Sequence, residues 1–367
     1  MSIDMKSSDT IIRPITNSLT AGKLPKRSPL WILLGSWLIT AAVFLVLQVT
    51  EVADGFNLVG TLVFGTVLYC VAIYALSHMV EGARQAKDRL MTALVTAAFI
   101  IALVPLVSIM ITTAINGLPA FITPTFFSSS MRNVVGAGGG VLHAITGTLL
   151  VTGMATLISV PIGLLSAIYL TEYGRGRLAK AITFFVDVMT GVPSIVAGLF
   201  AFALFALLFN DPGIRFGFGG SIALAVLMIP VVVRSSEEML KLVPNELREA
   251  AYALGVPKWL TIMKVVLPTS IAGIVTGVML AIARVIGETA PLLIIAGFTA
   301  SMNYDLFSER MMTLPVYVYN QYVSQGVDAQ SYVDRAWAGA LTLILIVMVL
   351  NGAARLIARI FSPKFGR

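Results

Sequence analysis

The charged residues that stand out in this sequence lie inside long apolar runs. Arg284 and Glu288 are four residues apart in the apolar stretch 271–297, so on one helix they would share a face and could pair. A charged side chain at the centre of a bilayer costs about 2.5–3.5 kcal/mol on insertion scales, which makes such residues candidates for function. Pro291 removes a backbone donor and clashes with the carbonyl of residue 287, which predicts a kink or break beside the pair.

The chemistry that an arginine could do there is oxyanion binding. A guanidinium offers two parallel donors that match the oxygens of phosphate or a carboxylate. The pair could instead neutralise itself and join two helices. Arg234 follows a second apolar run, 222–233, which as a helix would cover about 18 Å of a hydrocarbon core of about 30 Å. Arg234 could therefore lie at membrane depth, or its side chain could reach water from an ordinary helix end.

Two further candidates lie in the apolar stretch 182–209. Asp187 follows two phenylalanines and could pair with either arginine or accept hydrogen bonds at a helix end. The segment 190–194, Thr-Gly-Val-Pro-Ser, interrupts the run, and there Ser194 could supply a hydroxyl to a pathway. A proline kink that serves packing alone is the other interpretation.

These charges belong to a chain that is too apolar for an ordinary soluble domain. Of 367 residues, 57% are hydrophobic and 12% are charged, whereas soluble domains carry about 25% charged residues. With about 20 apolar residues for each bilayer crossing, we expect an all-α, polytopic membrane protein with about eight transmembrane helices. The predicted spans are 30–49, 56–77, 90–115, 145–169, 182–209, 218–233, 271–297 and 336–356.

The charge distribution predicts the orientation of these spans. Most of the 25 lysines and arginines fall in the two termini and in the alternate loops that share their side. Since positive charge favours cytoplasmic loops, we expect both termini in the cytoplasm. This asymmetry accounts for the net charge of +7 without a nucleic-acid partner.

Residue types that would mark an enzyme are scarce. The two histidines lie on different segments, the single cysteine lies in an apolar run, and no GxxxxGK[ST] phosphate loop occurs. We therefore predict no metal centre, no cofactor bound by this chain and no nucleotide-hydrolysing site of its own.

The segment 234–268, between the sixth and seventh predicted spans, is patterned as a helical hairpin. Ser235 and Glu238 have capping-box spacing, and Pro244-Asn245 is a second helix start. Gly255 should end the following helix as a left-handed cap. Two apolar stripes flank this glycine, the first formed by Leu247, Ala250, Ala251 and Leu254, the second by Trp259, Ile262, Met263 and Val266.

The hairpin is suited to docking. Small Ala250 and Ala251 allow close approach by another protein, so the hairpin could enter a partner's groove. An interfacial helix pair resting on lipid fits the pattern about as well. A DNA-reading helix-turn-helix is less favoured, because the loop's basic and acidic residues nearly cancel.

The hairpin also carries a family signature. Glu249-Ala250-Ala251, then Gly255, then Leu267-Pro268 resemble the EAA loop of ABC importer permeases, with Val265 where the pattern usually has Ile. In that family the loop docks into a cytoplasmic ATPase. The resemblance implies that ATP and Mg are bound by a partner chain. It implies coupling roles for Glu249, Ala250, Ala251, Leu254, Gly255 and Trp259.

A longer match, from about residue 90 to the C-terminus, narrows the family. It consists of the segments 228–234, 237–238, 243–244, 247–251, 283–284 and 287–291, supported by 147–148 and 191–194. Together these resemble the PstA-type permeases of bacterial phosphate ABC transporters. The resemblance implies a type I importer permease domain of six spans over 90–356, with its coupling loop at 234–268. The helices of 30–89 are additional to that core, and 1–29 and 357–367 are cytoplasmic tails.

The same resemblance implies a function and partners. The chain is expected to be a permease subunit, not an enzyme, in a bacterial plasma (inner) membrane importer of inorganic phosphate. Its expected partners are a PstC-like permease, a PstB-like ATPase dimer, a PstS-like phosphate-binding protein and the lipid membrane. Residues expected to line the pathway are Arg234, Arg284, Glu288, Thr289, Ser194 and Asp187. Glu288 would orient Arg284 and accept a hydrogen bond from protonated phosphate, which would disfavour sulfate.

Two other functions remain open from the residues alone. The nearer one is an ABC permease for another oxyanion or a small organic anion. The other is a membrane scaffold that docks a cytoplasmic partner through the hairpin and transports nothing.

Overall fold

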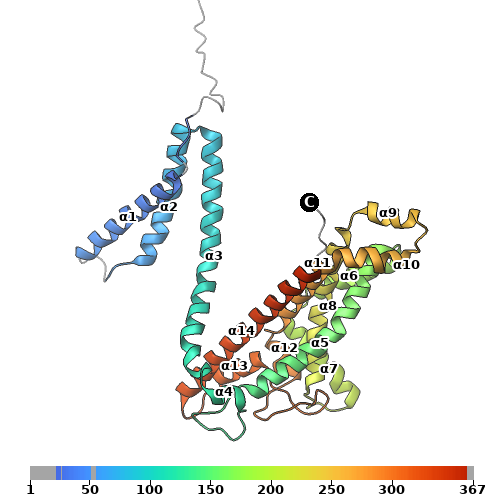
Figure 1. Ribbon diagram of the computed structural model, residues 1–367. Helices are drawn as coiled ribbons and strands as arrows, with labels where there is room; N and C mark the ends of the chain where they lie inside the picture. Colours follow the sequence, from blue (N-terminus) through green and yellow to red (C-terminus); the bar gives the residue numbers. More distant parts are fainter. Residues whose placement is uncertain (1–21, 26, 51–54, 362–367) are drawn as a thin grey trace, which may run out of the picture. The chain divides into compact units, whose positions relative to one another are not determined.

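A computed structural model describes residues 22–25, 27–50 and 55–361 (Figure 1). All the secondary-structure elements within these ranges are helices, which confirms the all-α prediction. The chain divides into two compact units, Met1–Ile109 and Met110–Arg367. The border falls inside the long helix α3 (Ala83–Phe121).

The first unit contains α1 (Ser28–Val49), α2 (Leu58–Val80) and the first part of α3. The two helices α1 and α2 approach closely at Gly65, where an added Cβ would lie 2.4 Å from a ring carbon of Trp37. Nearby, the Thr40 hydroxyl donates to the carbonyl of Thr61 at 3.0 Å. Small residues and hydroxyl groups at a helix contact are typical of packing inside membranes.

The turn between α2 and α3 is fixed by the Glu81 carboxylate. It accepts hydrogen bonds from Arg89 Nε at 2.6 Å and Arg89 Nη2 at 2.8 Å. The Ser77 hydroxyl and the Leu24 amide each donate to it at 2.8 Å. These donors, those of Arg89 foremost, favour the charged form and lower the pKa of Glu81 to about 2. Glu81 therefore stays ionised as it ties α2 to α3 and to the segment before α1.

The second unit is built around α5 (Leu142–Ile168) and α8 (Gly217–Lys241), which pack along their length. Helix α8 is the central element, because most of its residues are buried inside the unit. Around this pair lie α7 (Ser194–Phe209), α11 (Leu267–Val285) and α14 (Ala329–Phe361). The main hydrophobic cluster includes Val151, Met228, Val232, Val285 and Leu292.

The predicted spans correspond to the helices found. In the described part of the chain, seven helices are long and apolar enough to cross a membrane, or eight if the pair α6 and α7 is one span. Helix α6 (Arg177–Thr190) and α7 are bent by 110° at the break between them. The interruption predicted at 190–194 is confirmed, since Pro193 is extended and directly precedes α7.

A second break lies in the seventh predicted span. Helix α11 ends at Val285, and the short helix α12 (Ala290–Ile295) begins five residues later. This confirms the kink predicted from Pro291, which is in the first turn of α12. The two breaks are neighbours, because an added Cβ on Gly198 of α7 would lie 2.5 Å from Pro291 Cα.

Short elements complete one end of the second unit. These are α4 (Pro124–Ser128) and α13 (Leu314–Val323). The start of α5 is pressed against the chain that leads into α13. An added Cβ on Gly147 would lie 1.9 Å from the carbonyl oxygen of Met312, and the Thr148 hydroxyl accepts from Leu314 N at 2.7 Å.

A pair of glycine substitutions in α5 tests this contact. In Gly147→Ala the new methyl group meets a backbone carbonyl that cannot move aside, so we expect a loss of about 1–3 kcal/mol of stability. Gly153 has open space at its Cβ position, so Gly153→Ala should raise stability by about 0.5–1 kcal/mol. Thermal unfolding of the purified chain in detergent measures both. Equal midpoints for the two variants would contradict the close contact at Gly147.

Candidate functional site

The predicted helical hairpin is present at the end of α8. It consists of α9 (Asn245–Ala253), a turn at Gly255 and α10 (Lys258–Thr261), and the π-helical turn η2 (Ile262–Val266) leads on into α11. Because α8 continues to Lys241, the hairpin predicted at 234–268 is limited to 242–266, and we refer to this end of the unit as the hairpin end. Gly255 has φ +74°. Its amide donates to Tyr252 O at 2.9 Å, and Val256 N donates to Ala251 O at 3.1 Å. This pattern is a Schellman motif, so the predicted glycine cap is confirmed.

The predicted capping box at Ser235 and Glu238 is wrong. Both residues lie inside α8, which continues to Lys241. The Ser235 hydroxyl donates to the carbonyl of Val231 at 2.8 Å, one turn earlier in the same helix. A hydroxyl can satisfy itself within a helix in this way, so the spacing alone does not fix a helix start.

Neither of the two apolar stripes of the hairpin is buried as a whole. In the first, Ala251 is buried, whereas Ala250 and Leu254 are exposed, Leu254 to 84%. In the second, Ile262 and Val266 are buried, whereas Trp259 (62%) and Met263 are exposed. Glu249 is also exposed. The hairpin thus packs on its own unit with one side and presents large apolar side chains on the other, which is typical of an interaction surface.

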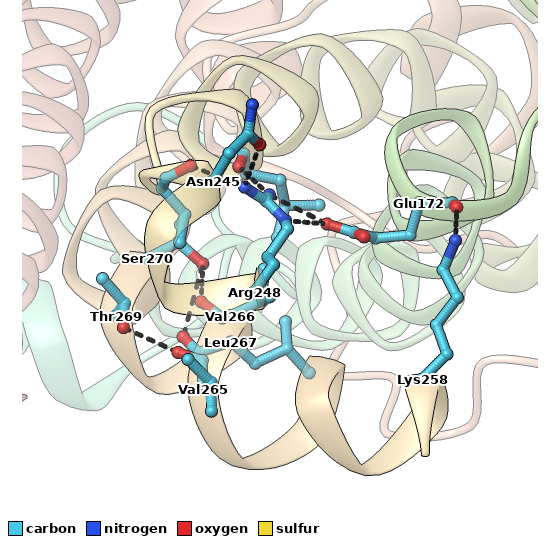
Figure 2. Close-up of polar contacts among 11 residues, drawn as sticks. Glu172, Asn245, Arg248, Lys258, Val265, Val266, Leu267, Thr269 and Ser270 are labelled. Atoms are coloured by element: carbon cyan, nitrogen blue, oxygen red, sulfur yellow. Dashed lines mark hydrogen bonds and ion pairs between the residues drawn. The ribbon is translucent and has the colours of Figure 1, made fainter. Parts of the chain in front are cut away.

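An ion pair that the sequence analysis missed holds the hairpin against α5. Glu172 lies in the π-helical turn η1 (Tyr169–Tyr173), which extends α5. Its Oε1 accepts from Arg248 Nη2 at 2.9 Å and Arg248 Nε at 3.1 Å, and both side chains are nearly enclosed (12% and 5% exposed; Figure 2). Arg248 was known only as part of the family motif, and Glu172 carried no signal because its partner is 76 residues away.

Arg234 is the centre of a chain of charges on α8. Its Nη1 donates to Glu237 Oε2 at 3.1 Å, and Lys241 Nζ donates to Glu237 Oε1 at 2.6 Å. Its Nη2 donates to Asp187 of α6. Of the two interpretations of Asp187, pairing with an arginine is therefore the one observed. Arg234 is 36% and Asp187 58% exposed, so the pair is open to its surroundings.

The predicted pairing of Arg284 and Glu288 on one helix face is wrong. Arg284 is in the last turn of α11, but that helix ends at Val285, and Glu288 lies in the connection to α12. Gly287 has a low helix propensity and Pro291 would deprive its carbonyl of a partner, so the helix stops before reaching Glu288. Among the described residues, no ion pair or side-chain hydrogen bond includes either residue. Arg284 is exposed and Glu288 half-buried.

The other predicted pathway residues lie at the two helix breaks. Thr289 immediately precedes α12, and its carbonyl accepts from Leu293 N at 2.9 Å. Ser194 is the first residue of α7, and α7 packs against α12. Both residues are half-buried.

The packing of α8 on α11 places the two arginines at different depths. An added Cβ on Gly277 of α11 would lie 2.5 Å from Ser235, the residue after Arg234. Arg284 is seven residues beyond Gly277, away from the hairpin end, which is about 10 Å at 1.5 Å per residue. The two arginines therefore lie at separate positions along the α8–α11 contact and do not form one cluster.

Comparison with known proteins defines the family. The model of the family described as "Binding-protein-dependent transport system inner membrane component" matches residues 159–367. The Mycobacterium tuberculosis protein named phosphate transport system permease protein PstA 1 is 44% identical over 276 residues, 75% of this chain and 88% of that protein. The Pasteurella multocida protein named phosphate transport system permease protein PstA is 40% identical over 282 residues, 77% of this chain and 96% of that protein.

A solved structure shares the fold. The structure of a bacterial ABC transporter involved in the import of the acidic polysaccharide alginate aligns with a TM-score of 0.52 at 17% identity, over 74% of this chain and 96% of that one. The chain therefore belongs to the binding-protein-dependent transport system inner membrane component family, as a multi-pass ABC transporter permease that groups with the PstA proteins.

Proposed function

We propose that this chain is the permease subunit of an ATP-driven importer that moves inorganic phosphate into a bacterial cell. The observation that carries the proposal is the 40–44% identity to proteins named PstA, over nearly the whole length of those relatives. In this proposal the six spans of 90–356 form the permease domain, and the helices of 30–89 are an addition to it. The hairpin end and both termini face the cytoplasm, because most of the basic residues lie on that side.

Phosphate would pass between this chain and a PstC-like permease. Arg284 supports this path because it lies in the last turn of a helix apolar and long enough to span a membrane, is exposed, and forms no ion pair with a carboxylate of the described residues. Arg234 would act nearer the cytoplasm, with its charge partly balanced by Asp187. Such partial balance suits a pathway, since the sites must release what they bind. Ser194 and Thr289, at the two helix breaks, would add hydroxyl groups, and Glu288 would accept from protonated phosphate.

The energy would come from outside this chain. A PstB-like ATPase dimer, which binds ATP and Mg, would dock on the exposed side of the hairpin. Leu254 and Trp259 support this docking, because binding is stabilised when a partner covers exposed apolar side chains of this size. A PstS-like binding protein would deliver phosphate at the opposite end. This chain itself would hold no cofactor and perform no catalysis.

Uptake of labelled phosphate by cells that carry this chain with its partner subunits tests the proposal. We expect ATP-dependent uptake that excess unlabelled phosphate blocks and excess sulfate does not. Glu288→Gln should weaken that discrimination, because the amide cannot favour the protonated oxyanion as a carboxylate does. If another anion blocks the uptake instead, that anion and not phosphate is the substrate. A complex that assembles and imports nothing would leave a scaffold as the function.

A further inference from the structure

Glu172, in the π-helical turn that extends α5, forms hydrogen bonds with both helices of the hairpin. Its carboxylate accepts the two hydrogen bonds from Arg248 of α9, and its backbone carbonyl accepts from Lys258 Nζ of α10 (Figure 2). The Lys258 ammonium also lies 4.8 Å from the centre of the neighbouring Tyr173 ring. We propose that Glu172 is a positioning residue through which movement of the hairpin drives α5. The proposal rests on the function given above.

Arg248 is well suited to transmit such movement, because it is tied to more than Glu172. Its Nη1 donates to Val243 O at 2.6 Å and to Asn245 Oδ1 at 3.2 Å, and its Nη2 donates to Leu240 O at 3.0 Å. The guanidinium therefore joins the end of α8, the start of α9 and η1 in one network. A nearly enclosed charge held by several partners resists displacement, since breaking one contact leaves a desolvated charge unpaired.

The chain connects the hairpin directly to α8 and α11 but not to α5. Movement of the hairpin can reach α5 without passing through those helices only by non-covalent contacts such as this one. Glu172 also lies in a π-helical turn, and a second such turn, η2, joins the hairpin to α11. Single π turns are frequent at functional sites in helices. The pair thus ties one π-helical turn, η1, to a hairpin that itself ends in another, η2.

Helix α5 extends the connection to the opposite end of the unit. Near the end of α5 that leads into η1, an added Cβ on Gly163 would lie 2.6 Å from Val232 Cγ1 of α8. At the far end of α5, the Thr148 hydroxyl accepts a hydrogen bond from the backbone amide of Leu314, at the start of α13. Displacement of η1 would therefore be passed along α5 to the segment before α13. Loss of Glu172 should leave the ATPase docked while its cycle no longer drives transport.

The test is the transport stoichiometry of the full importer in proteoliposomes, measured as phosphate imported per ATP hydrolysed. We expect Glu172→Gln to lower this ratio at least about fivefold, the low end of usual allosteric couplings, with the ATPase still co-purifying. Asp88→Asn is the matched control, because Asp88 is an exposed carboxylate of the first unit, outside the coupling loop 234–268. Its ratio should equal that of the unaltered protein. Import and hydrolysis that fall together in Glu172→Gln, at constant ratio, would overturn the proposal.

Two further variants cover a failure of Glu172→Gln to assemble. Arg248→Lys keeps the charge, but an ammonium cannot reproduce the guanidinium's forked contacts, so its ratio should also fall. A fully coupled Arg248→Lys protein would overturn the proposal. The double variant Glu172→Gln/Arg248→Lys should be no worse than the poorer single one if the pair acts as a unit, whereas additive losses would count against it. Absence of phosphate import by the unaltered complex would refute the proposed function instead.

Discussion

Replacing Arg284 with alanine should lower the initial rate of phosphate import by about two orders of magnitude while the complex still assembles. Hydrogen bonds to a charged group contribute about 1.5–3 kcal/mol each, and each 1.4 kcal/mol is about tenfold. Arg284 is exposed at the end of α11 and makes no ion pair within the described residues, so its loss should not disturb the fold. Labelled-phosphate uptake, with co-purification of the partner subunits, measures both effects.

Two comparisons sharpen this prediction. Arg284→Lys retains the charge but loses the fork that matches two phosphate oxygens, so import should be intermediate. Arg177→Ala removes an exposed cation at the start of α6, near the hairpin end, and should import normally. If Arg284→Ala imports at the rate of Arg177→Ala, the arginine does not line the pathway.

The second large effect is expected at the hairpin, where Leu254→Asp should separate the chain from its ATPase. Leu254 is 84% exposed, so the fold loses little when it is replaced. A docked leucine contributes about 1.5–3 kcal/mol through burial, and an aspartate would in addition have to lose its water. Affinity for the ATPase should fall about 100-fold or more, and ATP-dependent import should be lost with it. Co-purification of the ATPase, followed by a binding titration, measures the change.

The control for Leu254→Asp is Val327→Asp. Val327 is 97% exposed and lies in the connection between α13 and α14, at the other end of the unit. The same charge added there should leave ATPase binding unchanged. Retained ATPase binding in Leu254→Asp would mean that the exposed side of the hairpin is not the docking surface.

The spans and their interruptions could be predicted because their causes are local. Pro193 and Pro291 break helices because proline has no backbone N–H to donate. Gly255 ends α9 because glycine readily adopts the left-handed conformation of a helix cap. Length and apolarity placed the remaining helices, although α3, α8 and α14 extend up to eight residues beyond the predicted spans. The EAA motif then located the hairpin, although its periodicity did not show which side chains would be covered.

The errors and omissions concern interactions that local pattern does not determine. Arg284 and Glu288 have the spacing of a helical pair, but Gly287 and Pro291 end the helix first. Ser235 has the spacing of a cap, yet the helix continues through it because its core face stays buried. The Glu172–Arg248 pair depends on how α5 and the hairpin meet in space, and neither residue's neighbours reveal that.

The close approach of α5 and α8 at Gly163 restricts how these two helices can move relative to one another. If one helix slid along the other, Val232 of α8 would collide with the backbone of α5. Gly163 has no side chain that could move aside to relieve the contact. We therefore expect α5, when the hairpin displaces η1, to pivot against α8 near Gly163 and not to slide along it. We expect the hinges of such a motion at the interrupted helices, 190–194 and 286–289, where the regular helical hydrogen bonding is interrupted.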